Sequence, residues 1–174
     1  MARTESRPLS LPRRWAHVMT TCNPPPGDVD PFSRWLVIVR ACVLPMTFTS
    51  AAIAGLLAVR HPGFDPALFA VAAAGMVIAH VANNLMNDLF DVRTALDTEG
   101  YPRALYAPHP VLSGMITMRG LWSVTAVVNV VSLAVLVGLT YARGWPVAAF
   151  ALAGFVVSAG YTAPPLRLKK RAMG

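Results

Sequence analysis

The sequence has few charged residues, and this deficit excludes several kinds of protein. Asp, Glu, Lys and Arg make up 13% of the 174 residues, whereas 55% are hydrophobic and the mean hydropathy is +0.52. A soluble domain carries about a quarter charged residues. Disordered chains, collagen and coiled coils are excluded by the same values. The apolar residues form four blocks long enough to cross a bilayer, which predicts an all-α, polytopic membrane protein.

Cysteine is also scarce. Cys22 precedes the first apolar block and Cys42 lies inside it. Two cysteines placed in this way make no disulfide framework, so we expect no bridge between them. We interpret both as ordinary small apolar residues.

The apolar blocks predict four membrane-spanning helices, because a spanning helix needs about 20 mostly apolar residues. The expected helices are residues 35–59, 67–91, 121–141 and 146–162. The first contains one charge, Arg40, and one proline, Pro45, which we expect to kink it. Before them, residues 1–33 read as a flexible cytoplasmic leader without the apolar core of a signal peptide. Residues 34–174 form the membrane domain.

The net charge of +7 is explained by its distribution along the chain. With four crossings, 12 of the 15 basic residues fall on one side, in the leader, the long connection of residues 87–120 and the tail. Only Arg60 and Arg143 fall on the other side. The positive-inside rule therefore predicts a multi-pass protein of the cell membrane with both termini in the cytoplasm. Anionic lipid is a fitting partner for this charge, and nucleic acid is not.

A stripe of polar side chains follows the end of the second apolar block. On a helix of about 100° per residue, five polar residues share an arc of about 100°; they are His80, Asn84, Asn87, Asp88 and Asp91. Polar groups near a membrane are costly unless they face a bundle interior or a wet cavity. Two carboxylates three residues apart repel each other unless a cation lies between them.

Oxygen ligands of this kind suit Mg²⁺, which is often held by one or two carboxylates together with substrate phosphates. Asp97 follows six residues after Asp91 and is placed to reach back as a third acid. A departing diphosphate needs such cations to neutralise its charge. The alternative interpretation is a helix end at the interface with its acids solvated by water. For His80 the plainer interpretation is a packed or hydrogen-bonded side chain.

These residues resemble a known family. The run Asn84-Leu-Met-Asn-Asp-Leu-Phe-Asp91, followed by Asp97, is similar to the first aspartate-rich motif of the UbiA superfamily of intramembrane prenyltransferases. The step from Asp91 to Asp97 is more similar to the menaquinone-type branch, the 1,4-dihydroxy-2-naphthoate prenyltransferases, than to the 4-hydroxybenzoate branch. Residues 108–114 and 161–169 resemble later segments of the same family.

The resemblance implies a fold of about nine spanning helices, each of about 20 residues, around a central cavity. It implies transfer of a polyisoprenyl group from a polyprenyl diphosphate to an acceptor, commonly an aromatic ring of quinone or related lipid biosynthesis. Mg²⁺ is held between two aspartate-rich motifs and the diphosphate, whose departure leaves an allylic carbocation for the acceptor to attack.

Two features depart from the family pattern. Ala95 stands where the family usually has glycine, and the second aspartate-rich motif is missing. The other close acids, Asp28 and Asp30, lie in the leader. We therefore expect the chain to be the N-terminal part of the fold, with four of the nine helices, half of the metal site and no activity by itself.

The resemblance and the polar stripe together assign roles to particular residues. Asp88 and Asp91 are the predicted catalytic acids. The predicted metal ligands are Asp88, Asp91, Asp97 and Asn84. The predicted diphosphate-binding residues are Asn84, Asn87, Arg119, Arg40 and Tyr161. Arg119 is equally well placed as a positive-inside anchor, and Tyr161 as an interfacial aromatic residue.

Two other functions compete with the enzyme. One is a non-enzymatic four-helix membrane module that assembles with a partner subunit. The other is a small transporter with an acidic cytoplasmic gate, which would need charges deep in the spans. Apart from Arg40 and His80, the predicted spans lack such side chains.

Overall fold

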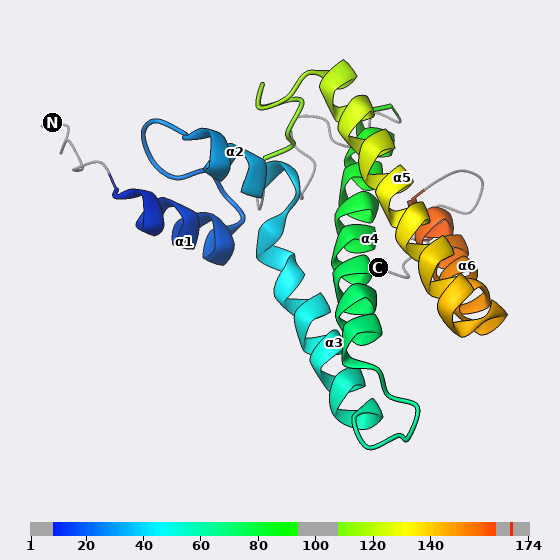
Figure 1. The fold of residues 1–174 in the computed structure, drawn as a ribbon. Helices are drawn as coiled ribbons and strands as arrows, with labels where there is room; N and C mark the ends of the chain where they lie inside the picture. Colours follow the sequence, from blue (N-terminus) through cyan, green and yellow to red (C-terminus); the bar gives the residue numbers. More distant parts are fainter. Residues whose placement is uncertain (1–8, 94–107, 163–167, 169–174) are drawn as a thin grey trace, which may run out of the picture.

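The computed structural model describes residues 9–93, 108–162 and Leu168, and these form a bundle of helices without strands (Figure 1). The elements are α1 (Leu11–Thr21), α2 (Pro31–Ile38), a short 3₁₀ turn η1 (Ala41–Val43), α3 (Leu44–Ala58), α4 (Pro66–Arg93), α5 (Met118–Arg143) and α6 (Trp145–Thr162). The predicted class, an all-helical membrane bundle, is confirmed.

Three of the described segments are long and apolar enough to cross a membrane: Ala41–Ala58, Pro66–Val92 and Met118–Arg143. The fourth predicted span is present as α6, but its apolar part, Trp145–Tyr161, is shorter than the others. A helix of that length reaches about 26 Å, slightly less than the hydrocarbon core of about 30 Å.

Helix α4 runs through the middle of the bundle, with α3 along one side and α5 and α6 along the other (Figure 1). Small residues let its neighbours approach closely. A Cβ atom added at Gly75 would lie 2.8 Å from Val135 Cγ1 on α5. A Cβ atom at Gly55 on α3 would lie 2.7 Å from Phe69 Cζ on α4. Both positions therefore exclude a larger side chain unless the facing residue moves.

The prediction of one continuous first helix with a kink at Pro45 is wrong. α2 ends at Ile38, and Arg40 follows in the left-handed conformation (φ 55°, ψ 51°), which stops a helix of L-residues. Pro45 lies in the first turn of α3, where its missing N–H is not needed, so it begins a helix instead of bending one. Arg40 consequently lies before the candidate span Ala41–Ala58, not inside a span.

The leader has more regular structure than its sequence suggests, because α1 packs against α2. The rings of Trp15 and Phe32 meet edge to face, with 4.9 Å between centroids. Asp30 caps α2 and accepts hydrogen bonds from the Ser33 hydroxyl (2.6 Å) and the Ser33 backbone N–H (2.9 Å). These bonds, chiefly the one from the hydroxyl, lower the pKa of Asp30 below its ordinary value.

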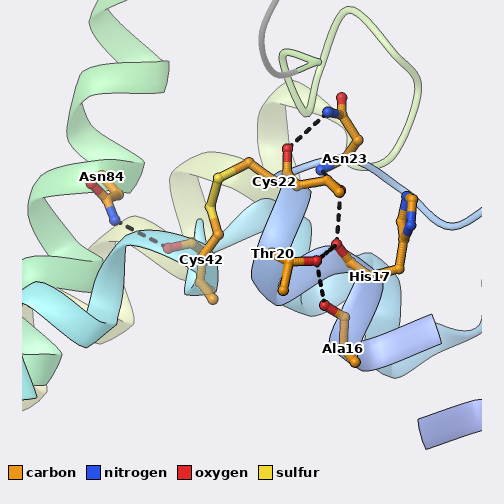
Figure 2. The surroundings of a disulfide bond; sticks show 9 residues. Ala16, His17, Thr20, Cys22, Asn23, Cys42 and Asn84 are labelled. Carbon is orange, nitrogen blue, oxygen red and sulfur yellow. Dashed lines mark hydrogen bonds between the residues drawn. A yellow bond between two sulfur atoms is a disulfide. The ribbon is translucent and has the colours of Figure 1, made fainter. Parts of the chain in front are cut away.

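The expectation that the cysteines stay apart is also wrong. Cys22 and Cys42 form a disulfide, with 5.4 Å between their Cα atoms (Figure 2). Cys22 is the left-handed cap of α1, and Cys42 lies in η1, after the break that turns the chain back toward α1. The break at Arg40, which hydropathy does not reveal, is what brings the two sulfur atoms together.

The buried apolar core is small and lies near the C-terminal end of α4. It consists of Ile38, Leu85, Leu89 and Leu121, with Val111 from the α4–α5 connection among the side chains packed against it. Along the other parts of the helices, large apolar side chains are exposed: Leu57 on α3 is 80% exposed and Phe150 on α6 is 81% exposed. Such faces suit lipid tails or further apolar helices.

Candidate functional site

The last turns of α4 carry buried polar side chains beside the apolar core. Asp88 and Asp91 are both 0% exposed and Asn84 is 5% exposed, while Asn87 is half-buried. All four belong to one unbroken helix, as the stripe predicted. Burial of a carboxylate is costly unless it is ion-paired or coordinated, so these acids are held in a protein interior and not solvated as a frayed helix end.

Arg40 makes an ion pair with Asp88. The left-handed backbone at Arg40 ends α2 and places its side chain against α4. The sequence predicted Arg40 as a diphosphate ligand and Asp88 as a metal ligand, and the structure brings these two residues together. A buried acid beside a guanidinium is a stable arrangement only while the pair persists.

Asn84 fastens the same turn to α4 at a second point. Its Nδ2 donates a hydrogen bond of 3.2 Å to the backbone carbonyl of Val39 (Figure 2). Because the amide nitrogen faces the turn, the Oδ1 atom is the part of this side chain suited to a cation or a metal-bound water. Two neighbouring residues of the turn, Val39 and Arg40, are thus held by two residues one helical turn apart.

His109 covers the site from the α4–α5 connection and was missed by sequence reasoning as a functional residue. It is 6% exposed, and its Nε2 lies 3.0 Å from the backbone carbonyl oxygen of Asp88. The Val111 backbone N–H donates to its Nδ1 at 3.2 Å, so Nε2 carries the proton and donates to Asp88. His109 could have been found from the sequence because it belongs to residues 108–114, a segment that resembles the family.

Two further polar contacts hold other helices to α4. His80 hydrogen-bonds Thr47 on α3, which bears out the plainer interpretation of that histidine. The Ser158 hydroxyl on α6 donates to the side-chain Oδ1 atom of Asn83. These contacts place α3 and α6 around α4 without adding an acid to the site.

For two other predicted residues, Arg119 and Tyr161, the described part of the chain shows no contact with the acids. Arg119 is exposed on the first turn of α5. Tyr161 is 37% exposed near the end of α6. Asp97 lies outside the described residues.

The donor set can be tested against the predicted cation. The described residues contain no group of three or more His, Cys, Asp or Glu side chains that would form an all-protein cage. They do contain two buried carboxylates one turn apart, with an amide oxygen beneath them. Mg²⁺ is usually bound by one or two carboxylates plus waters and substrate phosphates, so Asp88, Asp91 and Asn84 fit a metal that arrives with a phosphate.

A hollow of about 290 Å³ lies at the opposite end of α4. Phe64, Phe69 and Arg143 are among its lining residues. Its acid, Asp65, accepts hydrogen bonds from the backbone N–H groups of Ala67 (2.9 Å) and Leu68 (3.0 Å) and so caps α4. The carboxylate there is committed to helix capping, and the Asp88 end remains the candidate site.

Comparison with known proteins identifies one match. The model of the UbiA prenyltransferase family matches residues 48–174, more than two thirds of the chain, and this segment contains Asp88 and Asp91. No curated protein and no solved structure matches the chain.

Proposed function

The chain belongs to the UbiA prenyltransferase family, and we propose that its α4 end is the site where a polyprenyl diphosphate loses its diphosphate. The observation that carries the proposal is the burial of Asp88 and Asp91 within the segment that matches the family, with Asp88 paired to Arg40, which precedes that segment. Family membership supports an intramembrane prenyltransferase in general. The roles of the individual residues are our proposal.

The proposed reaction needs negative charge to be neutralised as it develops. The bond between the allylic carbon and the diphosphate oxygen breaks, and its electron pair leaves with the diphosphate. The acceptor ring then attacks the allylic cation and loses a proton. Mg²⁺, when bound, would neutralise charge on the departing diphosphate. Asp88, Asp91 and the Oδ1 atom of Asn84 would hold that cation, with Asp97 as a further acid.

Arg40 has a distinct proposed part. In the structure it balances the charge of Asp88. We propose that the guanidinium also binds a diphosphate oxygen when substrate is present, since Arg recognises phosphate through a planar fork of donors. Asn87, half-buried on the same helix, is proposed as a second diphosphate contact. Arg119 and Tyr161 remain predictions that the described contacts do not support.

We propose that the acceptor is a hydroxylated naphthoate or a related aromatic ring. The reason is the six-residue step from Asp91 to Asp97, which is similar to that of the menaquinone-type branch.

The test is Asp91→Asn, with Asp28→Asn as the matched control because Asp28 is an exposed leader acid. Labelled polyprenyl diphosphate and a panel of aromatic acceptors are supplied with Mg²⁺. Loss of one metal ligand should lower turnover at least about a hundredfold, the size of effect expected when transition-state charge stabilisation is removed. Asp28→Asn should retain the activity of the unaltered protein.

Binding provides a readout that needs no turnover. Mn²⁺, used in place of Mg²⁺ and followed by electron paramagnetic resonance, should bind in the presence of a polyprenyl thiodiphosphate and lose affinity in Asp91→Asn. Near-normal turnover and unchanged Mn²⁺ binding in this variant would remove the metal role. The chain would then be better described as a membrane module that assembles with a partner.

A further inference from the structure

The Cys22–Cys42 disulfide joins the left-handed cap of α1 to η1, the short turn that follows the left-handed residue Arg40. Cys22 (φ 59°) and Arg40 (φ 55°) are the non-glycine residues with positive φ in the described part of the chain. Cys22 caps α1, and Cys42 lies two residues after Arg40 in η1. The bond therefore ties the end of α1 to the turn that presents Arg40 to α4. Figure 2 shows the disulfide between Cys22 and Cys42, with Asn84 nearby.

The backbone bonds of this turn run between residues close in the sequence, and the Val39 N–H donates to the Trp35 carbonyl at 3.0 Å. The Arg40 N–H donates to the Val37 carbonyl at 3.1 Å, and the Val43 N–H donates to the Arg40 carbonyl at 3.1 Å. A left-handed conformation at a non-glycine residue persists only where the surroundings impose it. Here the surroundings are the Arg40–Asp88 ion pair, the bond from Asn84 to Val39, and the disulfide.

The charge distribution bears on what kind of disulfide this is. The basic leader that contains Cys22 belongs to the side of the membrane where 12 of the 15 basic residues fall, which the positive-inside rule assigns to the cytoplasm. Thiols there are kept reduced, and cytosolic disulfides are usually transient and catalytic or redox-sensing. A pair of cysteines at disulfide distance on that side is therefore suited to reversible oxidation and not to a permanent staple.

We propose that Cys22 and Cys42 are a reversible redox-modification site whose closure holds the Arg40 turn against α4.

The oxidant is a small-molecule disulfide of the glutathione type. A cysteine thiolate attacks it and releases one glutathione thiolate. The second cysteine thiolate then attacks the mixed disulfide and releases the other glutathione. Two cysteine thiols become one disulfide and two electrons reduce the oxidant, while the two protons leave to solvent or to the departing thiolates. Both cysteines are half-buried in the bundle, and Cys22, which lies outside the candidate spans, is the thiolate that meets the reagent first.

The first measurement uses the unaltered chain in membranes. Vesicles are equilibrated with glutathione and its disulfide at different ratios, quenched in acid and labelled with a heavy maleimide after solubilisation. We expect one transition between a doubly labelled and an unlabelled chain within the range of the buffers. A bond that stays closed in the most reducing buffer, or never forms in the most oxidising one, overturns the proposal. So does labelling of reduced thiols from the non-cytoplasmic side by an impermeant maleimide.

The second measurement asks whether the bond holds the turn. Hydrogen exchange is followed by mass spectrometry on peptides covering residues 37–47, in oxidised and reduced samples. We expect reduction to raise exchange severalfold in this segment, while peptides from the middle of α5 stay unchanged. The matched control is the double variant Cys22→Ser, Cys42→Ser, which should exchange like the reduced chain in both buffers. Equal exchange in oxidised and reduced samples of the unaltered chain would refute the linkage.

The proposal goes beyond prenyl transfer, although it shares Arg40 with the proposed site. Neither measurement uses turnover, Mg²⁺ or a prenyl substrate. A chain without prenyltransferase activity can therefore pass both tests, and an active enzyme can fail them.

Discussion

At the scale of single residues, Arg40 has two structural roles that its place in the sequence does not suggest. Its left-handed backbone ends α2, and its guanidinium balances the buried carboxylate of Asp88. Arg40 itself is partly exposed, with 23% of its side chain accessible, whereas the side chain of Asp88 is 0% exposed. The pair therefore has one end in the interior and one end near the surface of the bundle.

This arrangement predicts an asymmetric effect of mutation. Arg40→Met removes the ion-pair partner of a buried acid and should lower the free energy of unfolding by about 3 kcal/mol, near the lower end of the range for breaking buried pairs. Adding Asp88→Asn to Arg40→Met should restore part of that loss, because the amide carries no charge. Thermal unfolding of the purified protein in detergent, followed by tryptophan fluorescence, measures both. A double variant no more stable than Arg40→Met would show that the pair does not govern stability.

At the scale of elements, α4 organises the fold because every other long helix is positioned by a contact with it. α3 approaches through Gly55 and α5 through Val135, which packs on Gly75. α6 packs mainly against α5 and also reaches α4 through the bond from the Ser158 hydroxyl to the side-chain oxygen of Asn83. Since the acids lie at the end of the same helix, displacement of these neighbours should also disturb the site.

The close approach of α4 and α5 predicts different tolerance at two glycines. Gly75→Leu must displace Val135 and should destabilise the protein by about 1–3 kcal/mol, as overpacking does. Gly138→Leu on α5 is the control, because a Cβ atom there meets nothing within 4 Å. Its effect should stay within about 0.5 kcal/mol. Melting temperatures in the same detergent compare the two variants, and equal destabilisation would contradict the close contact.

At the scale of the whole molecule, the apolar faces and the charged ends point to a chain embedded in lipid. No more than 17% of any candidate span is buried inside the described bundle, while basic residues concentrate outside the spans. The connection between α3 and α4 and the connection between α4 and α5 lie at opposite ends of α4 (Figure 1). A membrane across the bundle would separate them.

This geometry predicts the labelling of single cysteines. In the Cys22→Ser, Cys42→Ser background, Pro62→Cys and Leu112→Cys place a thiol at exposed positions of the two connections. In sealed vesicles an impermeant maleimide should reach the two thiols from opposite sides, with residue 112 on the cytoplasmic face. Labelling of both from the same side would exclude a crossing by α4.

Local patterns in the sequence predict the class of the molecule and which side chains share the candidate face of α4. Long apolar blocks require helices in lipid, because backbone polar groups there must be satisfied within the segment. The helical period placed Asn84, Asp88 and Asp91 on one face, and α4 is one helix over this stretch. Both inferences rest on local patterns, which a sequence displays directly.

The groups that complete this face are known from the three-dimensional arrangement of the chain. The left-handed break at Arg40, its pairing with Asp88, the cover by His109 and the Cys22–Cys42 bond all depend on segments distant in the chain. Apolar residues lie on both sides of Arg40, so the first apolar block is predicted as one helix. Contacts of this kind depend on the direction that the chain takes after each turn, and neither composition nor periodicity predicts that direction.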